Sequence, residues 1–251
     1  MSYREWTIAV EEISDVLPLR TAARFGLDQN SLNTQINASI ALGSSENALR
    51  RRIHRALYEK YADEYQKEWE RAPLASFWDD AYLRGFRSEE LQLSGLKTRG
   101  LALEAVSLNN CILKECEMSD FHARATEFVN TRFVLSSFTS PRFDYCPLTN
   151  CEFMFSALAG ARLTRCRFSD GTRFQFMRVF DSVFVHTDGD VEFDGVAFKN
   201  VTFECCDMTG FVFRNCDFAG NIMFKECDVR GIDFGRVCHN SNLFFYDCEK
   251  D

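Results

Sequence analysis

The sequence lacks the features that mark membrane-spanning and exported chains. No run of 18 apolar residues occurs among its 251 residues, so we expect no membrane-spanning helix. The N-terminal segment MSYREWTIAVEEIS has no basic stretch followed by an apolar run, so we expect no secretory signal either. We therefore expect a cytoplasmic protein that does not bind membranes, in a reducing compartment that keeps its 11 cysteines unpaired.

Motifs of catalysis and metal binding are missing as well. The chain has only four histidines, at positions 54, 122, 186 and 239, and no two of them form a His-x-x-x-His pair. It has neither a phosphate-binding glycine loop nor a nucleophile elbow. Its cysteines recur five residues apart rather than three, which argues against a zinc knuckle. These absences predict a non-enzymatic protein without a cofactor.

What the sequence does contain is a period of five. Phenylalanines stand at positions 128, 133, 138 and 143, a spacing that matches neither the helical period of 3.6 nor the strand period of 2. The pattern runs from Leu103 to Phe244, with register shifts after Phe168, across the segment VHTDGD (185–190) and after Phe218. A large apolar residue occupies 26 of its 28 centres, and a repeat of this length indicates a solenoid.

The residue two places before each centre is small. Eight of the 11 cysteines stand there, far more than chance placement in a period of five gives, and we interpret them as small core side chains. Where a centre is small, as at Ala123, the residue two places earlier is the large Phe121, an exchange of volume that close packing requires. The eight cysteines are Cys111, Cys116, Cys146, Cys151, Cys166, Cys206, Cys216 and Cys227.

Several repeats combine a small residue, an aspartate, a large apolar residue and two variable residues. Examples are NCDFA (215–219), CCDMT (205–209) and GIDFG (231–235). In this pattern the chain resembles the pentapeptide-repeat family over roughly residues 91–248. The resemblance implies a mainly β fold, a right-handed quadrilateral β-helix with four pentapeptides per coil. In such a helix the small and the large residue of each repeat point inward, and 28 repeats make seven coils.

The first ninety residues do not follow the period of five. Apolar residues at steps of four from Leu49 to Trp69 predict a long amphipathic helix with Ser44 or Ser45 as its N-cap. We therefore predict a small all-α domain over residues 1–88, followed by the pentapeptide-repeat solenoid over residues 91–248. The helices either bind a partner or cap the first coil, whose open end is an unpaired sheet edge.

Without catalytic motifs, the leading hypothesis is a protein-interaction scaffold or adaptor, whose partner the sequence does not name. Residues 91–187 carry a net charge of +2 and residues 188–251 a net charge of −7. The resemblance offers an alternative, because quinolone-resistance members of the family occupy the DNA saddle of gyrase or topoisomerase IV. An acidic DNA mimic of that kind would bind a type II topoisomerase or another DNA-binding protein. A further alternative is a bacterial effector.

Two charged segments supply the candidate partner-binding residues. The acidic segment DGDVEFDG (188–195) copies half of a calcium loop, but Val201 stands where that loop needs its last ligand. We interpret it as solvated acids on a loop where the repeat shifts register. The basic run lies on the long helix and is followed by acids one turn later, a pattern typical of a solvated face. The two sets are Asp188, Asp190, Glu192 and Asp194, and Arg50, Arg51, Arg52 and Arg55.

The C-terminal sequence NLFFYDCEKD continues the period with a centre at Phe244. Phe245 and Tyr246 then lie just outside the core, and with Leu243 they either cap the last coil or form the contact of a homodimer. The resemblance implies the homodimer, because some relatives dimerise end to end through the final coil.

Overall fold

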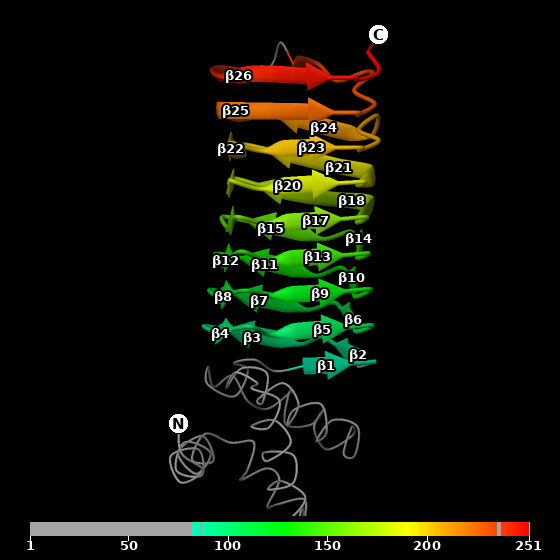
Figure 1. The fold of residues 1–251 in the computed structure, drawn as a ribbon. Helices are drawn as coiled ribbons and strands as arrows, with labels where there is room; N and C mark the ends of the chain where they lie inside the picture. The colour runs from blue at the N-terminus through cyan, green and yellow to red at the C-terminus, as the bar shows by residue number, and fades with distance from the viewer. Residues whose placement is uncertain (1–81, 86, 235–236, 251) are drawn as a thin grey trace, which may run out of the picture.

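The computed structural model describes residues 82–85, 87–234 and 237–250. The predicted all-α region lies outside the described residues up to position 81, and with it lie Arg50, Arg51, Arg52 and Arg55. The described chain forms short strands, most of them three residues long, stacked in one column that ends at β26 near the C-terminus (Figure 1). Within this described part, no helix is long and apolar enough to cross a membrane.

The strands lie on four faces of the column, and pairing between successive coils is parallel. The first face holds β1 (Tyr82–Arg84), β5 (Ala102–Glu104), β9 (His122–Arg124), β13 (Arg142–Asp144), β17 (Arg162–Thr164), β20 (Val183–Val185), β23 (Thr202–Glu204) and the C-terminal halves of β25 (Asp217–Lys225) and β26 (Cys238–Tyr246). The second face holds β2 (Arg87–Glu89), β6 (Ser107–Asn109), β10 (Glu127–Val129), β14 (Pro147–Thr149) and the N-terminal parts of β18 (Arg167–Gln175) and β21 (Asp188–Asp194).

The third and fourth faces complete each coil. The third face holds β3 (Gln92–Ser94), β7 (Ile112–Lys114), β11 (Arg132–Val134), β15 (Glu152–Met154), the C-terminal parts of β18 and β21, and β24 (Phe211–Arg214). The fourth face holds β4 (Lys97–Arg99), β8 (Glu117–Ser119), β12 (Ser137–Thr139), β16 (Ala157–Ala159), β19 (Arg178–Phe180), β22 (Ala197–Lys199) and the N-terminal halves of β25 and β26. β18, β21, β25 and β26 therefore run round a corner from one face to the next.

The repeat centres point into the column and stack there. In the regular coils, pairing partners are 20 residues apart, as for Phe133 with Phe153. Since strands in a ladder lie about 4.8 Å apart, a centre rises by that step in each coil. On the third face the rings of Phe133, Phe153, Phe174, Phe193 and Phe213 form one continuous stack, with successive centroids 4.4, 4.6, 5.0 and 5.1 Å apart. Each of these rings is buried, which removes a large apolar area from water.

Most corners are made by one residue with a positive φ. The asparagines at one corner, Asn110, Asn130 and Asn150, have φ values of 53°, 49° and 50°. This left-handed conformation is unfavourable for most residues but tolerated by asparagine. The side-chain amide nitrogen of Asn130 donates to the side-chain oxygen of Asn110 at 3.0 Å, and the side-chain amide nitrogen of Asn150 donates to that of Asn130 at 2.7 Å. Side-chain ladders therefore reinforce the turns as well as the strands.

The fold is that of a pentapeptide-repeat β-helix. All eight cysteines predicted to be small core residues are buried and form no disulfide. Phe121 and Ala123, the pair predicted to exchange volume, are both buried as well. The β-helix begins earlier than the predicted residue 91, because β1 and β2 lie within the range assigned to the all-α domain. Polar centres at Ser88 and Thr98, both buried, hide the period there, and the column has about eight turns rather than seven.

The acidic segment DGDVEFDG (188–195) is not the loop that the sequence predicted, because most of it forms β21. Asp188 and Gly189 belong to β21 and pair with Arg167 and Phe168, so Gly189 occupies a repeat centre that has no side chain. A Cβ atom there would collide with the carbonyl oxygen of Phe168. Phe211 supplies the missing volume, with its ring 5.9 Å from that of Phe168. The sequence showed a register shift here but not its cause, because a glycine centre breaks the apolar pattern without breaking the coil.

The predicted register at the C-terminus is also wrong by one residue. Phe245, not Phe244, pairs with the buried centre Phe224, and their rings stack at 4.9 Å. Phe244 points outward and is 37% exposed. In the sequence Phe244 continues the step of five from Phe234, and only the pairing with β25 reveals the extra residue that makes Phe245 the centre.

Candidate functional site

The predicted acidic segment lies on β21, and most of its carboxylates have basic or amide partners. Asp188 accepts a hydrogen bond from the Nε of Arg167 at 3.1 Å. Glu192 lies between two arginines, 2.7 Å from Arg214 and 3.6 Å from Arg173. Asp194 accepts a hydrogen bond from the side-chain amide of Asn215 at 2.8 Å. Asp190 is exposed and forms no ion pair with a described residue. These four residues therefore do not form an uncompensated negative patch.

A different set of acids forms a column on the second face. Asp207 lies one coil beyond Asp188, as shown by the hydrogen bond from its amide to the Thr187 carbonyl. Asp228 pairs with Asp207, and Glu249 pairs with Asp228. We call Asp188, Asp207, Asp228 and Glu249 the acidic column. Its signal in the sequence is a recurrence about 20 residues apart, which a search for adjacent charges does not detect.

All four members of the acidic column contact neighbouring side chains, Asp188 through Arg167 and Glu249 through Arg230 at 3.4 Å. The carboxylate of Asp207 accepts hydrogen bonds from the amide and the hydroxyl of Thr209, at 3.1 and 2.8 Å. Arg230 binds Asp228 and holds the pKa of that carboxyl below its usual value. Among the described residues, however, Asp207 forms no ion pair, and the column keeps a net negative charge.

Exposed apolar residues line the corner between the third and fourth faces. Leu135, Phe155 and Phe176 occupy this corner in three successive coils and are 51%, 53% and 56% exposed. The rings of Phe155 and Phe176 stack 5.6 Å apart with an interplanar angle of 15°. We call these three residues the apolar corner. Large apolar groups grouped on a surface in this way are typical of interaction sites. The period of five marks only the inward positions, so it gives no sign of this group.

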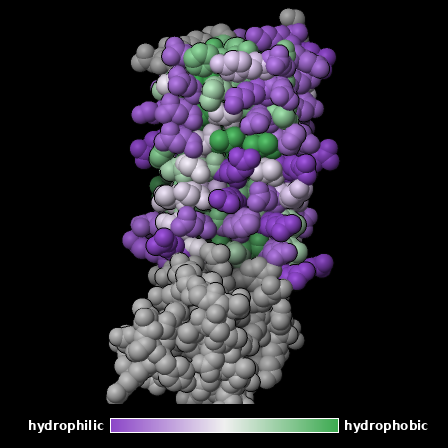
Figure 2. All heavy atoms as spheres, in the orientation of Figure 1, coloured by the Kyte–Doolittle hydropathy of each residue, from purple (hydrophilic) through white to green (hydrophobic). Residues whose placement is uncertain are grey.

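The middle of the first face is basic. Arg142 pairs with Arg162 in the next coil, and Arg124 on β9 pairs with Asp144 of the same strand as Arg142. None of these three arginines forms an ion pair with a described residue, whereas His122 and Asp144 bind each other at 2.9 Å. Figure 2 shows one side of the column, where hydrophilic residues predominate and hydrophobic ones form small groups. Positive charge in the middle and negative charge toward the C-terminus agree with the division expected from the sequence.

The predicted dimer contact at the C-terminus is only partly exposed. Leu243 and Phe245 pack against the core, and Lys250 lies over the Phe245 ring with its Nζ 3.8 Å from the centroid. Tyr246 is 50% exposed and stacks with Phe244 at 6.3 Å. The exposed aromatic pair at this end is therefore Phe244 and Tyr246.

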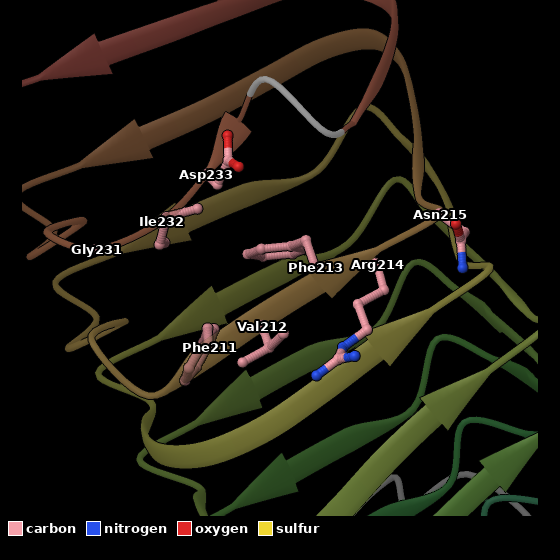
Figure 3. Close-up of a pocket in the computed structure, with 8 residues that line it drawn as sticks. All are labelled: Phe211, Val212, Phe213, Arg214, Asn215, Gly231, Ile232 and Asp233. Carbon is pink, nitrogen blue, oxygen red and sulfur yellow. The ribbon is translucent and has the colours of Figure 1, made fainter.

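A cavity opens on the third face where the ladder of strands ends. It has a volume of about 450 Å³ and lies between β24 and the segment Gly231–Asp233 of the next coil (Figure 3). Phe211 and Phe213 line its inner side, and Arg214 and Asn215 lie at one end.

Among the described residues, the titratable groups buried in the core are thiols. Burial raises the pKa of Cys151 to about 12 and that of Cys216 to about 11. The described residues contain no group of three or more His, Cys, Asp or Glu side chains placed to hold a metal ion.

Comparisons with known proteins give remote structural likenesses. No protein-family model matches the sequence, and no curated protein does. A trypsin-treated variant of QnrB1, a plasmid-mediated fluoroquinolone resistance protein, is 12% identical over 69% of this chain and 85% of its own, with a TM-score of 0.27. Full-length QnrB1 is 14% identical over 68% and 91%, with a TM-score of 0.22.

The catalytic domain of a GH87 α-1,3-glucanase in complex with nigerose is another structural neighbour. It is 8% identical over 64% of this chain and 53% of its own, with a TM-score of 0.23. Identities and TM-scores this low carry no argument about function, so the surfaces of this chain have to supply one.

Proposed function

We propose that this protein is a non-enzymatic protein-interaction scaffold whose outer surface binds a protein partner. The observation that carries the proposal is the apolar corner. Leu135, Phe155 and Phe176 keep more than half of their side-chain surface in solvent although the same coils bury other phenylalanines completely. Their exposure is unfavourable in the free protein and becomes favourable when a partner covers them.

The fold gives such a surface a fixed shape. Each corner residue is held by the coil below and the coil above, as by the hydrogen bond from the Phe155 amide to the Gln175 carbonyl at 3.1 Å. A surface that is already ordered loses little conformational entropy when it binds. A stack of aromatic side chains on a rigid corner therefore suits a protein partner with an apolar groove.

The test replaces the apolar corner by an asparagine corner of the kind that the chain already has. The triple variant is Leu135→Asn, Phe155→Asn, Phe176→Asn. Asparagine tolerates the positive φ of these positions, as it does at Asn110, Asn130 and Asn150. Tagged full-length chain is used to capture partners from cells of the native host, and the captured proteins are quantified. We expect the triple variant to lose at least one partner that the unaltered chain captures.

The matched control changes a different corner. Ala105→Asn with Ala125→Asn makes the same kind of substitution between the first and second faces, where both alanines have positive φ. This control should capture the same proteins as the unaltered chain. If the triple variant and the control capture identical sets, the apolar corner is not the interaction site.

A second candidate function is mimicry of DNA toward a type II topoisomerase or another DNA-binding protein. The acidic column favours it, because carboxylates at a step of about 4.8 Å form a line of negative charge along a narrow rod. The arginines beside Asp188 and Asp228 reduce that charge. Neutralising Asp188, Asp207, Asp228 and Glu249 as amides should abolish any effect of the purified chain on gyrase supercoiling. Neutralising Asp190, Glu192 and Asp194 should change the effect less.

A further inference from the structure

The third face ends one strand short of its neighbours. β24 pairs with β21 on one side, and among the described residues no strand pairs with its other side. In the next coil, the amide of Ile232 donates instead to the carbonyl of Val229 at 3.3 Å. β24 therefore presents an open edge inside the length of the column rather than at its end.

The backbone groups of that edge show the missing pairing directly. Lower on the third face, the carbonyl two places before each centre accepts from the next coil, as Cys111 does from Arg132 at 2.9 Å. The amide after each strand donates to the next coil, as Gly195 does to Arg214 at 2.9 Å. The corresponding carbonyl of Phe211 and amide of Asn215 have no hydrogen-bond partner in the described part of the chain.

The stack of phenylalanines ends at the same place. By the spacing of this coil, Phe234 is the counterpart of Phe213, but its ring packs on those of Phe224 and Phe245, at 5.3 and 5.4 Å. The space above Phe213 is the cavity of about 450 Å³ (Figure 3). A cavity lined by aromatic rings beside unpaired backbone groups has the chemistry of a site for an added β-strand.

We propose that an extended segment of a protein partner binds in this cavity as the missing strand, parallel to β24. The segment places an apolar side chain on Phe213 and an acidic side chain beside Arg214. This inference deepens the interaction function proposed above and rests on it in naming a protein as the partner.

Charge identifies the acidic position. On this face each arginine contacts a glutamate one coil away, as in Arg132 with Glu152 at 2.9 Å and Arg173 with Glu192 at 3.6 Å. Arg214 has its glutamate on the β21 side, and its side chain is 64% exposed. An acidic residue on the added strand would give Arg214, whose register partner on β21 is Asp194, a second carboxylate partner on its open side.

The length of the edge sets the size of the segment. β24 has four residues, which span about 13 Å in an extended strand. A pentapeptide of the sequence Val-Glu-Phe-Asp-Gly, which copies residues 191–195 of the neighbouring strand, matches that length and both side-chain requirements. Its valine would lie over Phe211, its phenylalanine over Phe213 and its aspartate beside Arg214.

The experiment measures binding of this fluorescein-labelled pentapeptide to the purified full-length chain by fluorescence anisotropy. One control peptide has aspartate in place of its phenylalanine, and a second carries an N-methyl group on the glutamate amide, which would donate to the Phe211 carbonyl. We expect each control to bind at least about tenfold more weakly, because each loses one contact of the strand. Equal binding of the three peptides, or binding of none, overturns the proposal.

A charge exchange tests the orientation of the segment. Arg214→Glu should weaken binding of the pentapeptide and strengthen binding of the same peptide with lysine in place of its aspartate. Arg178→Glu, on the fourth face, is the matched control and should leave both affinities unchanged. If the lysine peptide gains nothing with Arg214→Glu, the added strand does not lie as proposed.

Other occupants give distinct outcomes. A homodimer that Arg214→Glu dissociates would assign the cavity to a second copy of this chain and overturn a foreign partner. Slow amide exchange at Asn215 without peptide would show that the chain closes its own edge, which also overturns the proposal. Capture that depends on the apolar corner while no peptide binds would leave the proposed function standing and remove only this inference. Peptide binding by a chain whose capture of partners does not depend on the apolar corner would support the added strand and remove the apolar corner as the interaction site.

Discussion

At the scale of single residues, the position within the repeat decides what a phenylalanine does. Phe153 is 1% exposed and stacks between two rings of the core, whereas Phe155, two residues later, is 53% exposed at a corner. The same residue type thus stabilises the fold at one position and is available to a partner at the other.

We predict that Phe153→Ala lowers the free energy of unfolding by about 3–5 kcal/mol, because it leaves a cavity in the stack of rings. Phe155→Ala should change it by about 0.5 kcal/mol or less, as is usual for exposed positions. Urea denaturation followed by circular dichroism measures both. Similar losses for the two variants would show that the corner rings also carry the fold.

The buried thiols make stability depend on alkaline pH. Burial raises the pKa of Cys151 to about 12 and that of Cys216 to about 11, whereas an unfolded cysteine ionises at about 8.5. Below about pH 8.5 both thiols are protonated in the folded and the unfolded chain, and the free energy of unfolding is unaffected by their ionisation. As the pH rises from there toward the pKa values of the folded chain, the free energy of unfolding falls by about 1.4 kcal/mol per pH unit for each thiol.

We accordingly predict a lower free energy of unfolding at pH 9.5 than at pH 7.5, measured with urea in the presence of a reducing agent. Cys151→Ala with Cys216→Ala should reduce this difference, since Ala161 shows that alanine fits the same position of the repeat. An unchanged difference in the double variant would mean that other groups set the alkaline limit.

At the scale of elements, β21 depends on a glycine in its path. Gly189 has a φ of +99° and lies against the backbone of Phe168, so a methyl group has no room there. Gly171, in the bulge of β18 to which β21 pairs, has a similar φ of +85° but no atom within 4 Å of an added Cβ. An alanine at Gly171 would suffer only the unfavourable φ, whereas an alanine at Gly189 would also collide with the backbone, so comparing the two positions distinguishes these effects.

We predict that Gly189→Ala prevents folding or lowers the thermal midpoint far more than Gly171→Ala does. For Gly171→Ala we expect a loss of about 1–2 kcal/mol from the unfavourable φ alone. Thermal unfolding of the two variants side by side measures the difference. If both lose the same amount, the close approach to Phe168 has little effect on stability.

At the scale of the whole molecule, the protein is a one-dimensional stack. Each strand contacts only the coils before and after it, so stability is a sum over neighbours and is lowest where a neighbour is missing. β11 is paired on both sides, while β26 pairs only with β25 among the described residues. The free edge of β24 is a second point of low stability within the stack.

Hydrogen exchange measured by mass spectrometry should therefore show a gradient along the chain. We expect peptides that cover β11 and β15 to exchange slowest and peptides that cover β26 to exchange fastest. The peptide that contains Asn215 should exchange faster than the one that contains Gly195, whose amide is bonded. Uniform protection from end to end would show that the column unfolds as one cooperative unit.

The sequence by itself determined the repeat and its consequences. A period of five with a small and a large residue in each unit predicted a solenoid with those residues in its core, and the resemblance to the pentapeptide-repeat family implied the four-sided coil. It did not determine the register at Gly189 or at the final coil, because a glycine centre and two adjacent phenylalanines, Phe244 and Phe245, leave no local signal. Polar centres hid the start of the column for the same reason.

The tertiary structure decided everything that depends on contact between coils. Phe176 stacks on Phe155, and Asp207 lies one coil beyond Asp188, only because insertions and shortenings of single residues bring those positions into line. The open edge of β24 depends on where Phe234 packs, which its own pentapeptide does not specify. A local pattern sets the direction of a side chain within its coil, whereas the partner one coil away depends on the exact length of all four faces between them.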